Sequence, residues 1–186
     1  MKNLMFLLLT VFSITLSTGQ TKVGDATLPN TETFDKTTLK LNGAGVREKL
    51  WIDLYAAGLY LNEKSKDAKT IITGEKPMAI KLHIVSKLIS SEKLIDAVRE
   101  GFEKSTNGNT APIQAQIDTM LGYFKDEITK DDVFDLVYLP SRGVIAYKNG
   151  EERGTVKGKE FKEALFGIWL SGNPADEGLK DDLLGK

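Results

Sequence analysis

The stretch from Leu41 to Leu61, LNGAGVREKLWIDLYAAGLYL, restricts the fold of this chain more than any other part of the sequence. Side chains point to alternate faces of a β-strand, so residues of the same parity share a face. Arg47, Trp51 and Tyr55 have the same parity, which places a positive charge and two aromatic rings on one side. This arrangement is typical of a pocket wall with a polar end, although an ordinary strand with a solvated arginine has the same pattern.

Glycines divide this stretch. Gly43 and Gly45 predict a turn before Arg47, and the residues that follow are expected to form a hairpin or one long bent strand. In a straight strand, Arg47 and Tyr55 would lie about 26 Å apart, at roughly 3.3 Å per residue. Both side chains can therefore reach one ligand only if the chain bends or turns around residues 48–50.

The rest of the chain groups its strands and helices. The expected elements are a short helix within 65–74, a strand within 77–88, helices beginning near Ser90 and Pro112, three strands across 133–156, and helices at 161–170 and 176–184. Strands come first, helices occupy the middle, strands return and helices close the chain. That order predicts an α+β fold with a large antiparallel β-sheet.

The first residues have the pattern of a secretory signal peptide. Lys2 precedes an apolar run from Leu4 to Leu16, and small residues follow. We expect a signal peptide over residues 1–19, an N-terminal arm over 20–36 and one domain over 37–186. The apolar run is shorter than the about 20 residues of a membrane span. The cleaved protein is thus expected to be periplasmic or secreted without a stable membrane span, and an uncleaved membrane anchor is the alternative.

Composition excludes several kinds of site. The chain has no cysteine and one histidine, His83, so disulfides, thiolate metal sites and histidine-rich metal sites are excluded within one chain. The formal net charge of −1 gives no reason to expect a nucleic-acid partner. The sequence also lacks the motifs of serine hydrolases, nucleotide-binding loops and zinc proteases. We expect no metal and no cofactor.

The segment GAGVREK followed by LYAAGLYL resembles the chalcone isomerase-like family, in particular its bacterial members. The similarity continues through GKEFKEALFGIWLSGNPADEGLKDDLL and covers residues 37–185. The resemblance implies a large antiparallel sheet with helices packed on one face, an open-faced β-sandwich, and a ligand cleft between the two layers.

Enzymes of this family close a chalcone to a flavanone without a cofactor, and the resemblance can be followed through their polar residues. Arg47 matches the family's arginine, and Tyr55 falls where the family has a strand threonine. Leu94, Gly101 and Ile168 fall where the family has a tyrosine, an asparagine and a second threonine. Polarisation of an enone would therefore depend on Arg47 and Tyr55 alone. We expect no catalytic residue; an isomerase or lyase acting on an unknown enone-like substrate is the alternative.

The fatty-acid-binding members of the family keep the arginine and carry a tyrosine at the strand position, so the resemblance implies a binding protein. A guanidinium offers a planar pair of donors to a carboxylate, and a phenol adds a third hydrogen bond. We predict that Arg47 and Tyr55 bind the carboxylate of a fatty acid or a similar small amphipathic acid. The predicted lining of the apolar part of the pocket is Trp51, Leu94, Val98 and Ile168.

Two further interpretations fit the same residues. Arg47 could form a structural ion pair with an internal acid, with Tyr55 as a core aromatic residue. The chain could also be a protein-interaction module without a small ligand. An arginine on an open surface would favour this last interpretation, and an arginine inside a cleft would favour a ligand site.

Overall fold

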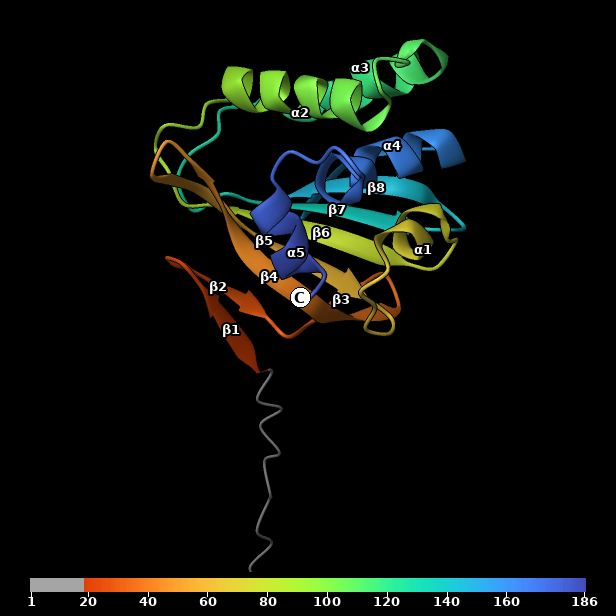
Figure 1. Ribbon diagram of the computed structural model, residues 1–186. Coiled ribbons are helices and arrows are strands. Elements are labelled where there is room, and N and C mark those ends of the chain that lie inside the picture. Colours follow the sequence, from red (N-terminus) through yellow and green to blue (C-terminus); the bar gives the residue numbers. More distant parts are fainter. Residues whose placement is uncertain (1–18) are drawn as a thin grey trace, which may run out of the picture.

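The computed structural model describes residues 19–186 (Figure 1). The signal peptide predicted over residues 1–19 lies outside the described residues, apart from Gly19. None of the described helices is long and apolar enough to span a bilayer.

A seven-stranded antiparallel sheet is the centre of the fold, and its strands follow one another in chain order from β3 to β9. The strands are β3 (Thr31–Phe34), β4 (Thr37–Lys49), β5 (Ile52–Leu61), β6 (Met78–Ile84), β7 (Val133–Leu139), β8 (Gly143–Lys148) and β9 (Glu151–Val156). Strands β1 (Gln20–Val23) and β2 (Ala26–Pro29) form a separate hairpin. The predicted α+β fold with a large antiparallel sheet is confirmed.

The helices form the second layer. They are α1 (Ala68–Thr73), α2 (Ser91–Ser105), the short 3-10 helix η1 (Ala111–Ile113), α3 (Gln114–Gly122), α4 (Lys159–Leu170) and α5 (Glu177–Leu183). Figure 1 shows α2 and α3 above α4, α4 above the sheet, and α5 alongside β4 and β5. The helices and one face of the sheet share a single hydrophobic core, which includes Leu82 of β6, Phe102 of α2 and Phe161 of α4. Helices thus pack on one face, as expected.

The other face of the sheet is covered by the N-terminal residues. Phe34 of β3 packs on Tyr147 of β8, with ring centroids 6.0 Å apart. The Tyr60 hydroxyl of β5 donates a hydrogen bond of 2.8 Å to the carbonyl of Pro29 in β2. Residues 20–36, expected as an arm outside the domain, therefore supply both a strand of the sheet and a cover for its second face. Their strands have four residues each, which is too short to show a period in the sequence.

The predicted turn at Gly43–Gly45 is wrong, because both glycines lie within β4. Their role is to let α5 lie directly on the strand. A Cβ atom at position 43 would lie 2.2 Å from the backbone oxygen of Asp182. The Asn42 side chain, next to this contact, donates a hydrogen bond of 2.8 Å to the carbonyl of Leu183. The glycines thus determine where α5 lies on the sheet.

A lysine is buried on the inner side of α4. Lys162 is only 1% exposed, and its Nζ donates to the carbonyls of Ile71, Ile72 and Gly74 at the end of α1. It also lies 4.9 Å from the ring centroid of Tyr138. Burial lowers the pKa of Lys162 to about 8.

This buried lysine predicts a specific dependence of stability on pH. Between pH 8 and the ordinary lysine pKa of 10.5, the folded protein binds fewer protons than the unfolded chain. The free energy of unfolding should therefore rise with pH in this window. Urea unfolding between about pH 8 and 9.5, below the usual titration of tyrosine, measures the slope. Lys162→Met should flatten it, and Lys159→Met on the exposed side of α4 should not; a flat profile in the original protein would show that the three carbonyls keep Lys162 charged.

Candidate functional site

A tight hairpin brings Arg47 and Tyr55 together. Strands β4 and β5 are joined by a two-residue turn, Leu50–Trp51, and Arg47 lies directly opposite Tyr55 in the register. Opposed residues of an antiparallel pair have Cβ atoms about 4.5–5.5 Å apart. The requirement that the chain turn between these two residues is met, with the turn slightly later than the expected 48–50.

A cavity of about 580 Å³ lies between this hairpin, β6, α2 and α4. Five of the six predicted site residues line it: Arg47, Tyr55, Leu94, Val98 and Ile168. Arg47 thus faces a cleft and not an open surface, with its side chain 21% exposed. This geometry favours a ligand site over a protein-interaction module.

Trp51, the sixth residue, is outside the cavity lining, and this part of the prediction needs correction. It occupies the tip of the hairpin and is 94% exposed. The parity argument assumed an uninterrupted strand, and the turn at Leu50–Trp51 breaks the alternation before Tyr55. Aromatic residues on either side of a turn need not share a face.

Arg47 has an internal acidic partner. Its Nη1 donates to Oδ2 of Asp176 and to the carbonyl of Glu48 at 3.0 Å. The other oxygen of Asp176 accepts a 2.8 Å bond from the Leu179 amide and caps the start of α5. The ion-pair interpretation is therefore correct as far as the contact is concerned. Within residues 19–186, however, all hydrogen bonds of the Arg47 side chain leave from Nη1, so the Nε–Nη2 edge can still receive a carboxylate.

Tyr55 is held as a hydrogen-bond donor. Its hydroxyl oxygen accepts a bond of 3.1 Å from Nε1 of Trp169 in α4. Burial raises the pKa of Tyr55, and the neighbouring Asp176 acts in the same direction, whereas Trp169 and Arg47 oppose the shift. The phenol thus keeps its proton at neutral pH. It donates that proton to no described residue, so the proton is free for a ligand.

The inner part of the cavity is apolar because α2 and α4 pack closely. A Cβ at Gly101 of α2 would lie 2.7 Å from Cγ2 of Ile168 in α4. A larger side chain at Gly101, such as the asparagine that the family resemblance implies for the enzymes, would require Ile168 to move. Leu94 and Val98 are also buried on the same side of α2. Besides Arg47, the lining has five charged side chains, one from β4 and four from α2: Lys49, Lys93, Asp96, Glu100 and Lys104.

The hydrogen-bond partners of Arg47 and Tyr55 were missed by sequence reasoning. Asp176 and Trp169 lie in the helices expected at 176–184 and 161–170, with no role in the site assigned to either. Capping and periodicity signal such helices, but they carry no information about a partner 129 or 114 residues away. Among the described residues, no cluster of three histidine, aspartate or glutamate side chains could hold a metal ion.

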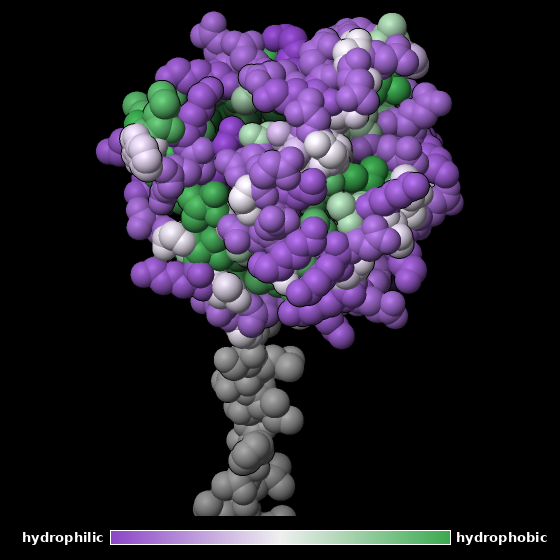
Figure 2. Space-filling model, viewed as in Figure 1, coloured by the Kyte–Doolittle hydropathy of each residue, from purple (hydrophilic) through white to green (hydrophobic). Residues whose placement is uncertain are grey.

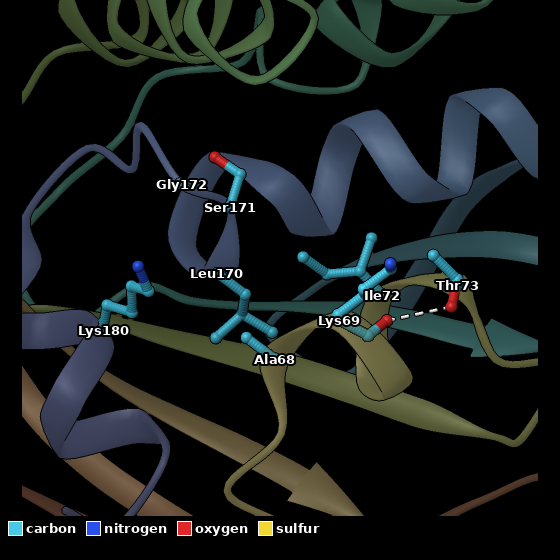
Figure 3. Close-up of a pocket in the computed structure, with 8 residues that line it drawn as sticks. All are labelled: Ala68, Lys69, Ile72, Thr73, Leu170, Ser171, Gly172 and Lys180. Carbon is cyan, nitrogen blue, oxygen red and sulfur yellow. Dashed lines mark hydrogen bonds between the residues drawn. The ribbon is translucent and has the colours of Figure 1, made fainter.

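A second cavity, of about 300 Å³, lies between α1 and the ends of α4 and α5 (Figure 3). Its lining is Ala68, Lys69, Ile72, Thr73, Leu170, Ser171, Gly172 and Lys180. The Thr73 hydroxyl donates to the carbonyl of Lys69 at 2.9 Å, the dashed line in Figure 3. Lys180 pairs with Glu177 at 3.3 Å. This cavity contains none of the predicted site residues, so the larger cavity is the candidate site.

Comparisons with known proteins agree with this fold. Residues 20–185 match a family model described as chalcone isomerase-like. The crystal structure of a fatty-acid binding protein from Arabidopsis thaliana superposes with a TM-score of 0.68 over 86% of this chain and 91% of that chain. The two sequences are 18% identical, so this likeness concerns the fold. No curated protein matches the chain.

Proposed function

Because this chain belongs to the chalcone isomerase-like family, we propose that it binds a fatty acid or a similar small amphipathic carboxylate without catalysing a reaction. The observation that carries the proposal is the cavity itself. It has a guanidinium and a phenol side by side at one end and aliphatic side chains further in. Its volume of about 580 Å³ falls in the usual range for small-ligand sites. The fatty-acid binding protein that shares the fold supports the same ligand class.

The bound carboxylate would sit beside the existing ion pair. The Nε–Nη2 edge of Arg47 would donate two hydrogen bonds to it, and the Tyr55 hydroxyl would donate a third. Asp176 would stay in place, because it also caps α5. The acyl chain would extend along Leu94, Val98 and Ile168. Since Gly101 and Ile168 leave no polar group to orient an enone, the isomerase alternative has less support.

The proposal predicts that Asp176→Asn strengthens fatty-acid binding. The Asp176 carboxylate repels a second carboxylate at the same arginine, and asparagine removes this charge while still capping a helix well. Removal of a like charge a few ångströms away should improve the binding free energy by about 1 kcal/mol, which corresponds to a several-fold increase in affinity. Calorimetric titration with a long-chain fatty acid measures the change.

Asp181→Asn is the matched control, because Asp181 lies on the same helix and pairs with Lys186 away from the cavity. It should leave the affinity unchanged. If no fatty acid binds to the original protein, the proposed function is wrong. If Asp176→Asn weakens binding, the ligand depends on Asp176 and is not a carboxylate beside it.

A further inference from the structure

The large apolar residues that are exposed in the described part of the chain gather around the β4–β5 hairpin. Leu50 is 80% exposed, Trp51 94%, Ile52 41% and Leu88 52%. Figure 2 shows an apolar patch at the upper left, where this hairpin projects in Figure 1. Leu50, Ile52 and Leu88 also line the candidate cavity, so the patch is continuous with the cavity mouth. We refer to these four residues as the apolar tip.

The conformation of the tip does not suit its residues. Leu50 and Trp51 have φ angles of +53° and +67°, the left-handed pair of a type I′ hairpin turn. Asn-Gly is the favoured sequence for such a turn, and bulky residues are strained in it. The β8–β9 hairpin of this protein has Asn149 and Gly150 at φ +53° and +81°. The chain thus uses the favourable turn sequence in one hairpin and two strained, exposed apolar residues in the other.

Backbone strain clusters at functional sites and exposed apolar patches mark interaction sites, so we expect the tip to contact something outside the free protein. Three side chains on a narrow hairpin and Leu88 in the loop between β6 and α2 are too few for a stable protein interface, which buries about 800 Å² on each partner. A bilayer interface accepts a small apolar projection, and tryptophan is enriched at that depth. We propose that the apolar tip inserts into the surface of a lipid bilayer.

The charges near the tip agree with a lipid surface. Lys49 precedes the turn, Lys87 precedes Leu88, and Lys93 donates a 3.0 Å hydrogen bond to the carbonyl of Leu88. The acidic residues of the hairpin, Glu48 and Asp53, oppose each other one step further from the turn than Lys49. The lysines are therefore placed to meet anionic headgroups when the tip is inserted.

The insertion goes beyond the proposed function, because it requires no bound fatty acid. The two would nevertheless cooperate. A cavity that opens at an inserted tip lets an acyl chain pass between bilayer and protein without crossing water. A lipid-soluble ligand would then reach Arg47 from the membrane.

The chain's two tryptophans make the insertion measurable. Trp51 is exposed, whereas Trp169 is 3% exposed but lines the cavity, so the quenching by lipids with brominated acyl chains that is lost in Trp51→Phe reports an inserted Trp51. We expect quenching of the full chain by brominated phosphatidylcholine vesicles, and stronger quenching when phosphatidylglycerol is included. No quenching with either vesicle would overturn the proposal.

Variants separate the tip from other membrane contacts. Leu50→Ser with Leu88→Ser keeps Trp51 as the reporter and should weaken vesicle binding roughly tenfold or more. Lys49→Gln should weaken binding to anionic vesicles only. Lys36 lies in the β3–β4 turn at the opposite end of the sheet, so Lys36→Gln should not change binding to either kind of vesicle. Equal quenching in the double serine variant would overturn the proposal.

A further double variant tests the strain. Leu50→Asn with Trp51→Gly installs the turn sequence of the β8–β9 hairpin, so the thermal midpoint should rise while vesicle sedimentation falls to the level of the double serine variant. If this variant sediments with vesicles as well as the original protein does, the proposal is overturned. A dimer that forms without lipid and disappears in this variant would also overturn it, and would assign the tip to a second copy of the chain.

Discussion

Replacing Arg47 by alanine is expected to weaken the binding of a long-chain fatty acid by at least about tenfold. A charge-assisted hydrogen bond contributes about 1.5–3 kcal/mol, and 1.4 kcal/mol corresponds to a factor of ten in the dissociation constant. Arg47→Lys should recover only part of the loss, because an ammonium lacks the planar pair of donors. Tyr55→Phe should cost less, about 0.5–1.5 kcal/mol, since one neutral hydrogen bond is lost and the ring remains.

Fold stability provides the control for these variants. The Arg47 and Asp176 side chains are 21% and 25% exposed, so loss of the pair should lower the free energy of unfolding by only about 1 kcal/mol. Thermal melts alongside the titrations separate the two roles of Arg47. A folded Arg47→Ala protein with unchanged affinity would rule out the carboxylate contact. An unfolded one would show that the ion pair is primarily structural, and Asp176→Asn would then destabilise the fold as well.

The largest loss of stability is expected for Gly43→Ala. A methyl group at this position would lie 2.2 Å from the Asp182 oxygen and 2.7 Å from the Leu183 oxygen, which are both backbone atoms. Backbone cannot rotate away as a side chain can, so either α5 must move off β4 or the strand must deform. Overpacking of this kind costs about 3 kcal/mol.

Urea unfolding measures this loss, with Gly122→Ala as the control. Gly122 ends α3 and has no atom within 4 Å of the added methyl group, so alanine there should be neutral or slightly stabilising. A change of less than 1 kcal/mol for Gly43→Ala would show that α5 can shift on the sheet at little cost, and that the glycines are not needed for its position.

The sequence indicated those strands and helices that are long enough to show a hydrophobic period. The order of strands and helices predicted the large antiparallel sheet, and the family resemblance implied that the helices pack on one of its faces. The turn at Leu50–Trp51 was not located to the residue, because these residues carry none of the usual turn chemistry. The misplacement of Trp51 follows directly, since parity cannot be continued through an unrecognised turn.

The burial of charged side chains was the other feature that the hydrophobic pattern of the sequence could not predict. Lys81 of β6 alternates with the apolar residues Ile80 and Leu82, a pattern typical of the outer face of a half-buried strand. In the structure it is 8% exposed and pairs with Glu32 at 2.9 Å and Asp135 at 2.7 Å. Desolvation opposes its charge, yet these two carboxylates raise the pKa of Lys81. The cover comes from β3, a strand too short to be recognised as part of the sheet.

The packing of α5 on the glycines of β4 has a consequence for the order of folding. Asn42 and Leu183 are 141 positions apart, and Arg47 and Asp176 are 129 apart. Contacts of this range form late, because the entropy of closing so long a loop must be overcome before they contribute. The β4–β5 hairpin and the strands β7 to β9 can form from contacts between residues close in sequence. The polar end of the cavity is complete only when α5 packs on β4. Binding competence should therefore appear as the slowest phase of refolding, after the strands have acquired their native circular dichroism.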